Sequence, residues 1–346
     1  MSNRILPAEW YPQDGILLTW PHADSDWAPW LSQIDKLYCQ IVKTISLYEK
    51  VLLVCFDDQH QTHIAKLLKE SDVALSKILF KIISSNDSWA RDHGPITVIE
   101  DHQPTLLDFA FTGWGGKYRS ERDNLISQRL FTQNTFNRID IEAQPLILEG
   151  GSIDCDGQGT LLTTEDCLLN PNRNTDLTKS DYENYFRQHF GVQRVLWLSQ
   201  GELVGDDTDS HIDMLARFCD SKTIAYTACD DKKDIHFEPL SFMEKELQSF
   251  RTLTNQPYKL VALPIPAPIH NDQGERLPAS YANFLIINGA VLVPVYGDKN
   301  DQIAVERLAE CFPDRKIIPI NCRSLIEQFG SLHCISMQLP AGTLKR

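Results

Sequence analysis

The chain has 346 residues, of which 42% are hydrophobic and 23% are charged, as in a soluble globular protein and unlike a disordered one. Its net charge of −14, from 47 acidic and 33 basic residues, argues against a nucleic-acid partner, because phosphates require a basic surface. The same charge favours the approach of a cationic substrate, although an acidic surface commonly serves solubility alone.

The first fifteen residues, MSNRILPAEWYPQDG, contain no apolar segment of the secretory type. The longest nearly apolar run, FLIINGAVLVPVY (284–296), is interrupted by Asn288 and Gly289 and is too short to span a bilayer. The nine cysteines include no Cys-x-x-Cys pair, and their number is odd. These features predict reduced thiols in a cytoplasmic protein with no membrane partner.

In chain order, β-rich runs predict strands over 15–20, 51–56, 95–99, 105–111, 194–198, 223–227, 259–263, 291–295 and 316–320. Helical patterns lie between several of them, over 30–48, 58–70, 178–190, 240–253 and 302–312. In the first of these helices the apolar stripe is formed by Trp30, Ile34, Leu37, Ile41, Ile45 and Tyr48. No linker or low-complexity segment interrupts the pattern, so we expect a single α/β domain over residues 1–346.

The segment GDDTDSHIDMLARF (205–218) places Asp207, Asp209, His211 and Asp213 at alternate positions, which an extended backbone would direct to one face. Such a face could bind a metal ion, or it could bind a planar cation with His211 as acid and base. The remaining histidines show no ligand spacing with one another, which weakens the metal interpretation. Asp92, Glu149 and Cys334 could complete a cation site, so the chemistry favours the second interpretation.

Three further segments supply those groups. NDSWARDHGP (86–95) carries Asp92 directly before a predicted strand, and LEGGSID (148–154) sets Glu149 before two glycines, where the backbone can bend. GSLHCISMQ (330–338) places His333 beside Cys334. An isolated cysteine is usually a buried apolar residue, so Cys334 is a candidate functional residue only because Asp92, Glu149 and His211 could lie near it.

Seven segments occur in a fixed order: NDSWARDHGP, FTGWGGKY (111–118), EGGSID, NPNRN (170–174), DTDSHIDMLARF, PASYANFLIINGAVLVPVYGD (278–298) and GSLHCISMQ. Together they resemble the agmatine deiminases of the bacterial-type peptidyl-arginine deiminase family, within the guanidine-modifying pentein superfamily. The resemblance covers nearly the whole chain. It implies a five-bladed α/β propeller around a central acidic active-site pocket, no metal or other cofactor, and a homo-oligomer, either a dimer or a tetramer.

The implied reaction converts agmatine into N-carbamoylputrescine and ammonia, a step toward putrescine. By their places in the motifs, Asp92 and Asp213 would bind the guanidinium, Cys334 would attack its carbon, and His211 would act as general acid and then as general base. Glu149 would accept a hydrogen bond from His211. Two departures from the family pattern stand near these residues: Ser210 replaces a frequent glycine before the histidine, and Phe329 begins the segment that precedes the nucleophile.

The motifs also contain aromatic and polar residues that lie next to the candidate reactive groups in the sequence. Trp89 and Trp114 are candidate substrate contacts, because an aromatic face can stack on a guanidinium, although tryptophans are often only packed. We expect His333, His93 and Asp87 to be structural.

The alternative functions are a peptidyl-arginine deiminase, a metal-dependent hydrolase built on Asp207, Asp209, His211 and Asp213, and an inactive binding module. An arginine-specific enzyme would need a cation for the α-carboxylate. Arg119, Arg122 and Arg173 are candidates for that role, although we expect them to face solvent.

Overall fold

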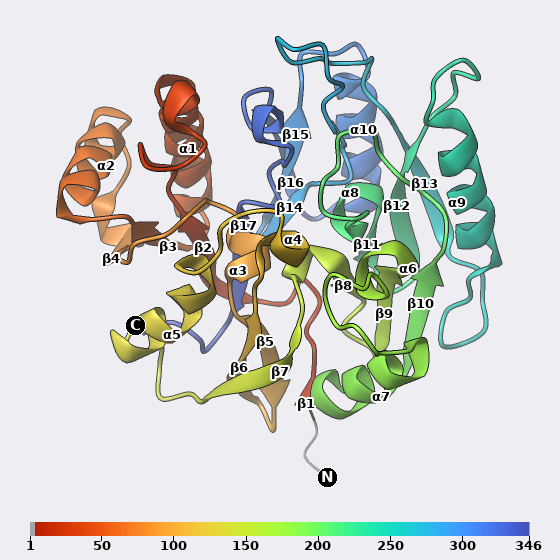
Figure 1. The fold of residues 1–346 in the computed structure, drawn as a ribbon, viewed down its shortest axis with the longest axis horizontal. Coiled ribbons are helices and arrows are strands. Elements are labelled where there is room, and N and C mark those ends of the chain that lie inside the picture. The colour runs from red at the N-terminus through yellow and green to blue at the C-terminus, as the bar shows by residue number, and fades with distance from the viewer. Residues whose placement is uncertain (1–3, 346) are drawn as a thin grey trace.

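The computed structural model describes residues 4–345, which form an α/β protein with five small sheets. Every sheet contains the same unit, in which the first strand pairs antiparallel with the second and the second pairs parallel with the third. A helix lies on the connection between the second and third strands, as parallel pairing requires a crossover. In the view of Figure 1 the sheets follow one another around the molecule.

One sheet joins both ends of the chain in the order β17-β2-β3-β4, formed by Ser336–Pro340, Gln13–Thr19, Lys50–Cys55 and Ile78–Ile82. The next has the order β1-β5-β6-β7, formed by Arg4–Ile5, Ile96–Glu100, Gln103–Ala110 and Ile141–Ile147. The third comprises β8 (Ile153–Cys155), β9 (Thr160–Thr164) and β10 (Arg194–Leu198). The fourth comprises β11 (Ala216–Asp220), β12 (Thr223–Ala228) and β13 (Lys259–Pro264), and the fifth β14 (Leu285–Ile287), β15 (Ala290–Val295) and β16 (Lys316–Asn321).

The longer helices are α1 (Leu31–Ser46), α2 (Asp58–Glu70), α5 (Ile126–Thr132), α7 (Lys179–Phe190), α9 (Phe237–Ser249) and α10 (Asp301–Cys311). Four single-turn helices are α3 (Ala90–His93), α4 (Gly113–Gly116), α6 (Glu165–Leu168) and α8 (Ile212–Leu215). Short 3-10 turns are η1 (Ala28–Trp30), η2 (Leu75–Lys77), η3 (Asp123–Leu125), η4 (Gly150–Ser152) and η5 (Ile326–Gln328).

The predicted elements are confirmed as elements, with every strand boundary within two residues of its expected place. The helix predicted over 240–253 lies earlier in the chain, at Phe237–Ser249. It ends before Phe250 because the backbone of that residue is already extended. Strands β1, β4, β7, β8, β9, β11, β14 and β17 were not predicted. Several of these are very short and run directly out of polar motifs, so they lack a readable alternation of their own.

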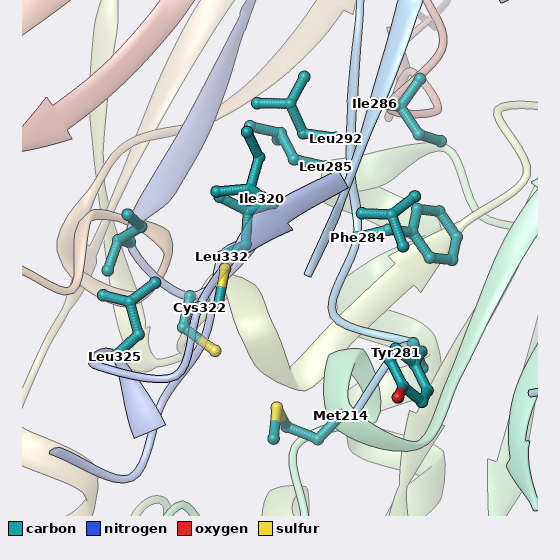
Figure 2. Packing of buried hydrophobic residues seen from close by; sticks show 14 of the residues in the cluster. Met214, Tyr281, Phe284, Leu285, Ile286, Leu292, Ile320, Cys322, Leu325 and Leu332 are labelled. Atoms are coloured by element: carbon teal, nitrogen blue, oxygen red, sulfur yellow. The ribbon is translucent and has the colours of Figure 1, made fainter. Parts of the chain in front are cut away.

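Buried apolar side chains fill the space between the sheets and their helices in two large clusters. Figure 2 shows part of the larger cluster, where Leu285 and Leu292 of one sheet lie near Ile320 and Leu332. Leu332 is fully buried and stands two residues before Cys334. The position of the candidate nucleophile is therefore fixed by core packing, which is as dense as an organic crystal.

All nine cysteines are free, in agreement with the expectation of reduced thiols. Within residues 4–345, no helix combines the length and the apolar character needed to cross a membrane.

Candidate active site

The repeated unit delivers polar side chains from equivalent points of the fold, each just before the first strand of a unit. They are Asp92 in α3 before β5, Glu149 at the start of η4 before β8, Asp213 in α8 before β11, Asn283 before β14, and Cys334 before β17. These segments are remote in sequence, yet each occupies the same position in its unit, directly before the first strand. The fold thus explains why reactive groups are scattered along the whole chain.

Asp92, His211, Asp213 and Cys334 line one pocket together with Trp89 and Trp114. The other lining residues are Asp87, Tyr118, Asp206, Asp207, Thr208, Met214, Gln328, Phe329 and Gly330. Among the described residues the lining includes five aspartates and no lysine or arginine. Such a pocket concentrates negative charge and favours a cationic ligand.

Cys334 is one of these lining residues and is 7% exposed. The side-chain amide of Asn283 donates to its Sγ at 3.2 Å, while the Asn283 carbonyl accepts from the backbone N–H of His333 at 2.8 Å. Burial, with the charges of Asp213 and Asp92, raises the pKa of Cys334 well above its ordinary value. The thiol is therefore protonated until something supplies positive charge nearby.

Asp213 is fully buried, and its two carboxylate oxygens have different surroundings. Oδ2 lies 2.7 Å from Nδ1 of His333 and 3.7 Å from the sulfur of Cys334. Oδ1 is buried and has no hydrogen-bond partner among the described residues. Burial alone would raise the pKa of Asp213, but the hydrogen bond and charge of His333, together with the charges of His211 and Arg217, outweigh burial and the pKa is lowered. An ionised oxygen without a donor is thus left for a ligand.

Asp92 is held from two sides: the indole of Trp114 donates to Oδ2 at 3.0 Å, and the backbone N–H of Gly151 donates to Oδ1 at 3.0 Å. Burial raises the pKa of Asp92 to about 6, despite the opposing charge of His211. The second glycine of the EGG motif is needed for this approach. A Cβ at Gly151 would lie 2.9 Å from Asp92 Oδ1 and 2.5 Å from His211 Nδ1.

His211 stands between two carboxylates, with Nδ1 3.7 Å from Asp92 and Nε2 3.8 Å from Glu149. Burial opposes its charge, but Asp92, Cys167 and Glu149 together outweigh burial and raise the pKa of His211 well above its ordinary value. Arg173 lies behind Glu149, with its Nε 3.2 and 3.3 Å from the two carboxylate oxygens. His211 is thus a protonated acid whose partner is itself fixed by a buried arginine.

Arg173 does not face solvent as expected, because its guanidinium is enclosed by Glu149, Asp209 and the carbonyl of Thr208. Arg119, in contrast, is exposed and pairs with Glu121. Neither Arg173 nor Arg119 lines the pocket.

The prediction that Asp207, Asp209, His211 and Asp213 share one face of an extended segment is wrong. Asp209 and Ser210 have positive φ angles of 66° and 65°, and Asp213 lies in the short helix α8. The left-handed pair reverses the chain, so Asp209 turns to Lys117 and Arg173 while His211 and Asp213 enter the pocket. Non-glycine residues rarely adopt this conformation, so the alternation in the sequence gave a false signal.

The metal site that this face would have formed is therefore absent from residues 4–345. The group of residues there whose atoms lie close enough to surround a metal is Glu149, Cys167 and His211. These donors fit a cation poorly, because the guanidinium of Arg173 already contacts both oxygens of Glu149. Its positive charge would repel a second cation at the same carboxylate.

Trp89 and Trp114 both line the pocket, where their ring centroids are 6.4 Å apart at an angle of 76°. Asp87 also lines the pocket and accepts hydrogen bonds from the indole of Trp27 and the backbone of Ser88. His93 lies within 3.3 Å of the hydroxyl of Thr19, as a packed structural residue. Burial lowers the pKa of His93 to about 3, so it stays neutral.

Sequence reasoning missed Asn283, although it lies within the quoted segment PASYANF, and it considered Arg173 only as a cation for a substrate carboxylate or as a solvent-facing residue, not as the partner of Glu149. It also missed Glu9, which lies in an unremarkable polar stretch near the N-terminus and reaches His333. An asparagine or an arginine in a motif carries no signal that distinguishes a buried contact from a turn.

The profile of the Porphyromonas-type peptidyl-arginine deiminases matches residues 5–340, and the chain belongs to this family. Among solved structures, a cysteine-to-serine variant of Campylobacter jejuni agmatine deiminase with substrate bound is 38% identical over 99% of this chain and 98% of its own, with a TM-score of 0.91. A Porphyromonas gingivalis protein, provisionally described as an arginine deiminase, is 42% identical over 99% of this chain and 100% of its own, with a TM-score of 0.92. A Vibrio parahaemolyticus protein, provisionally named agmatine deiminase, is 33% identical over 97% of this chain and 96% of its own.

The geometry at Gly151 makes a direct prediction. In Gly151→Ala the new Cβ would meet His211 and Asp92, which must move apart. Because a displacement of about 1 Å can cost ~10²-fold, we expect kcat/KM to fall at least that far while the protein remains folded. Steady-state kinetics and a thermal unfolding curve measure both effects. Normal kcat/KM would mean that the spacing of His211 and Asp92 is not critical.

Proposed function

We propose that this protein hydrolyses agmatine to N-carbamoylputrescine and ammonia through a covalent amidino-cysteine intermediate. The observation that carries the proposal is the charge of the pocket: five aspartates, one with an unpartnered buried oxygen, surround a thiol without any lysine or arginine in the lining. The family membership and the substrate-bound relative support the same reaction.

A guanidinium is planar and remains protonated to a pH above about 12, so it matches carboxylates placed along its edges. Asp92 and Asp213 would accept its N–H groups and hold the central carbon over Cys334. Trp89 and Trp114 would enclose the bound group, since both are pocket residues. Asp206 and Asp207 belong to the same lining and would favour the ammonium at the other end of agmatine.

Binding of the cation would also activate the nucleophile. The charges of Asp213 and Asp92 contribute to the raised pKa of Cys334 in the free protein. A guanidinium between these carboxylates neutralises them, so the thiol can lose its proton to solvent. The substrate thereby supplies the positive charge that a thiolate requires.

In the first half of the reaction the thiolate of Cys334 forms a bond to the guanidinium carbon. The C–N bond to one terminal nitrogen then breaks, and that nitrogen takes a proton from His211 to leave as ammonia. The charge of Glu149, whose carboxylate lies 3.8 Å from Nε2, would keep the imidazole protonated and oriented for this transfer.

In the second half a water molecule gives a proton to the now neutral His211 and attacks the same carbon. As the C–S bond breaks, the remaining hydroxyl proton passes to solvent, so the neutral ureido group is released and Cys334 returns to the thiolate. His211 is protonated again, so one residue serves as acid and then as base. No step requires a metal or another cofactor.

The pocket charge also bears on the alternatives. Free arginine would bring an α-carboxylate into a lining that includes no lysine or arginine among the described residues, and whose protonated His211 already lies between Asp92 and Glu149. Burying an unpaired carboxylate costs several kcal/mol, with each ~1.4 kcal/mol equal to a factor of ten in affinity. A peptidyl-arginine lacks this carboxylate, so charge repulsion does not exclude it. Discrimination between a peptidyl-arginine and agmatine would instead depend on the shape of the pocket mouth and on the free ammonium of agmatine.

We further propose that residues 1–346 act as one domain whose five sheets close into a five-bladed propeller around the pocket. The five repeated units and their equivalent delivery of pocket residues support this arrangement. We also propose a cytoplasmic homo-oligomer, a dimer or a tetramer, without nucleic-acid or membrane partners. The acidic net charge supports the exclusion of nucleic acid.

The substrate assignment predicts that agmatine is hydrolysed with a kcat/KM at least ~10³-fold above that of free arginine. It should also exceed that of benzoyl-arginine amide, and EDTA should leave the rate unchanged. Ammonia release measured at one pH tests all three. Preference for benzoyl-arginine amide would favour the peptidyl alternative, and loss of activity with EDTA that zinc restores would favour a metal hydrolase.

Replacement of the nucleophile should abolish turnover. In Cys334→Ala no group remains to form the covalent bond, so we expect kcat to fall by ~10³-fold or more. Cys229→Ala is the matched control, because Cys229 is a partly exposed thiol outside the pocket lining. Substantial turnover by Cys334→Ala would remove this cysteine from the mechanism.

The carboxylates that bind the guanidinium should be sensitive to neutralisation. Asp92→Asn and Asp213→Asn each replace a charged acceptor by an amide and should cost ~2–5 kcal/mol in kcat/KM. Asp108→Asn is the control, since Asp108 is also a buried aspartate but accepts a hydrogen bond from Gln128 outside the pocket lining. If both pocket variants kept the native kcat/KM, their carboxylates would be structural.

A further inference from the structure

His333 occupies an unusual position directly behind the pocket. Its Nδ1 lies 2.7 Å from Asp213 Oδ2, and its Nε2 lies 2.7 Å from Glu9 Oε2. All three side chains are at most 4% exposed. Glu9 comes from the N-terminal segment after β1, while His333 comes from the turn before β17, so this contact joins the two ends of the chain.

The geometry defines the protonation of the ring. An ionised carboxylate only accepts hydrogen bonds, so both ring nitrogens must donate, which an imidazole does only when both carry a proton. Arg217 donates to Glu9 Oε2 at 2.8 Å and the backbone N–H of Ile286 donates to Oε1 at 2.6 Å, which keeps Glu9 an acceptor. Although burial opposes it, Arg217, His333 and Arg91 hold the pKa of Glu9 below its ordinary value.

We propose that Glu9 and His333 form a positioning pair in which a doubly protonated His333 holds Asp213 ionised and oriented for the substrate guanidinium. The inference rests on the proposed function. His333 saturates Oδ2 of Asp213 from behind and leaves Oδ1, which has no partner among the described residues, for the ligand. Glu9 fixes the far side of the ring, so that the imidazole cannot rotate away. Neither residue touches the reacting atoms, and both act through Asp213.

Other charged groups surround this pair. On the side of Glu9 lie Arg91, Arg217 and Asp154, and on the side of Asp213 lie His211, Asp92 and the thiol of Cys334. Arg217 is buried and paired with both Glu9 and Asp154, and it acts on Asp213 through its charge without a hydrogen bond to it among the described residues. His333 is the cation in hydrogen-bond contact with Asp213, and its removal should leave Asp213 short of positive charge.

The kinetic test compares His333→Gln and Glu9→Gln with Asp154→Asn. Glutamine at 333 can still donate one hydrogen bond to Asp213 but carries no charge, and glutamine at 9 still accepts from His333. Asp154→Asn is the matched control, because it neutralises a carboxylate of the same ionic cluster that makes no hydrogen bond to His333 or Asp213 among the described residues.

In the native chain kcat/KM for agmatine should fall as the pH drops through about 6, where Asp92 takes up a proton. In His333→Gln we expect kcat/KM to fall by about 10- to 100-fold, mainly through KM. The acidic limb of the pH profile, in which kcat/KM falls as the pH drops, should move to higher pH by about one unit or more, because Asp213 loses the charge that keeps it ionised. Glu9→Gln should shift the limb in the same direction.

The acidic limb of Asp154→Asn should stay in place even if its stability falls. If His333→Gln and Glu9→Gln lowered the stability but left the pH dependence of kcat/KM unchanged, Glu9 and His333 would form only a structural contact, and the proposal would be overturned.

A second measurement reads the protonation of His333 without turnover. In the native protein labelled with ¹⁵N-histidine, two buried imidazoles, those of His211 and His333, should carry protons on both nitrogens at pH 7, and agmatine should not remove those of His333. Assignment follows from loss of the signal in His333→Gln, or from its displacement in Glu9→Gln. A neutral His333 ring would refute the positioning pair even if the native protein hydrolyses agmatine. Failure to hydrolyse agmatine with His333 doubly protonated would instead refute the proposed function.

Discussion

The pocket holds more buried negative charge than its own cations balance, and this excess governs the rest of the site. Asp92 and Asp213 lie near His211, yet the lining contributes no lysine or arginine, and Oδ1 of Asp213 has no partner among the described residues. Buried charges are costly unless they are paired, so the free protein keeps Cys334 as a thiol and raises the pKa of Asp92 to about 6. A bound guanidinium would complete the charge balance and ionise the nucleophile at the same moment.

The fold maintains this imbalance by placing its cations behind the acidic residues. Arg173 contacts Glu149 from outside the pocket, Arg217 contacts Glu9, and His333 contacts Asp213. Each cation keeps a carboxylate in place without entering the pocket lining. Because every unit contributes its polar residue just before its first strand, one repeated path of the backbone sets the whole arrangement. Core packing at Leu332 then fixes the turn that carries the nucleophile.

Much of this could be predicted from the sequence. The nine predicted strands and the amphipathic helices have clear periodicity, and the polar motifs identified Asp92, Glu149, His211, Asp213 and Cys334, which the structure brings together around one pocket. Alternation misled at Asp209 and Ser210, because a left-handed backbone breaks the two-residue period without changing the residue pattern. Glu9 could not be found, since its importance depends on a contact with a residue 324 positions away. Short strands such as β8 and β14 gave no signal of their own.

The covalent intermediate is the central claim, and it can be observed directly. Protein mixed with agmatine labelled at the guanidino carbon would be quenched with acid over the first turnover, digested and analysed by mass spectrometry. The account predicts transient label on the peptide that contains Cys334, with a mass increase equal to agmatine less ammonia. Label on a different residue, or product formed while Cys334 stays unmodified at every quench time, would contradict it.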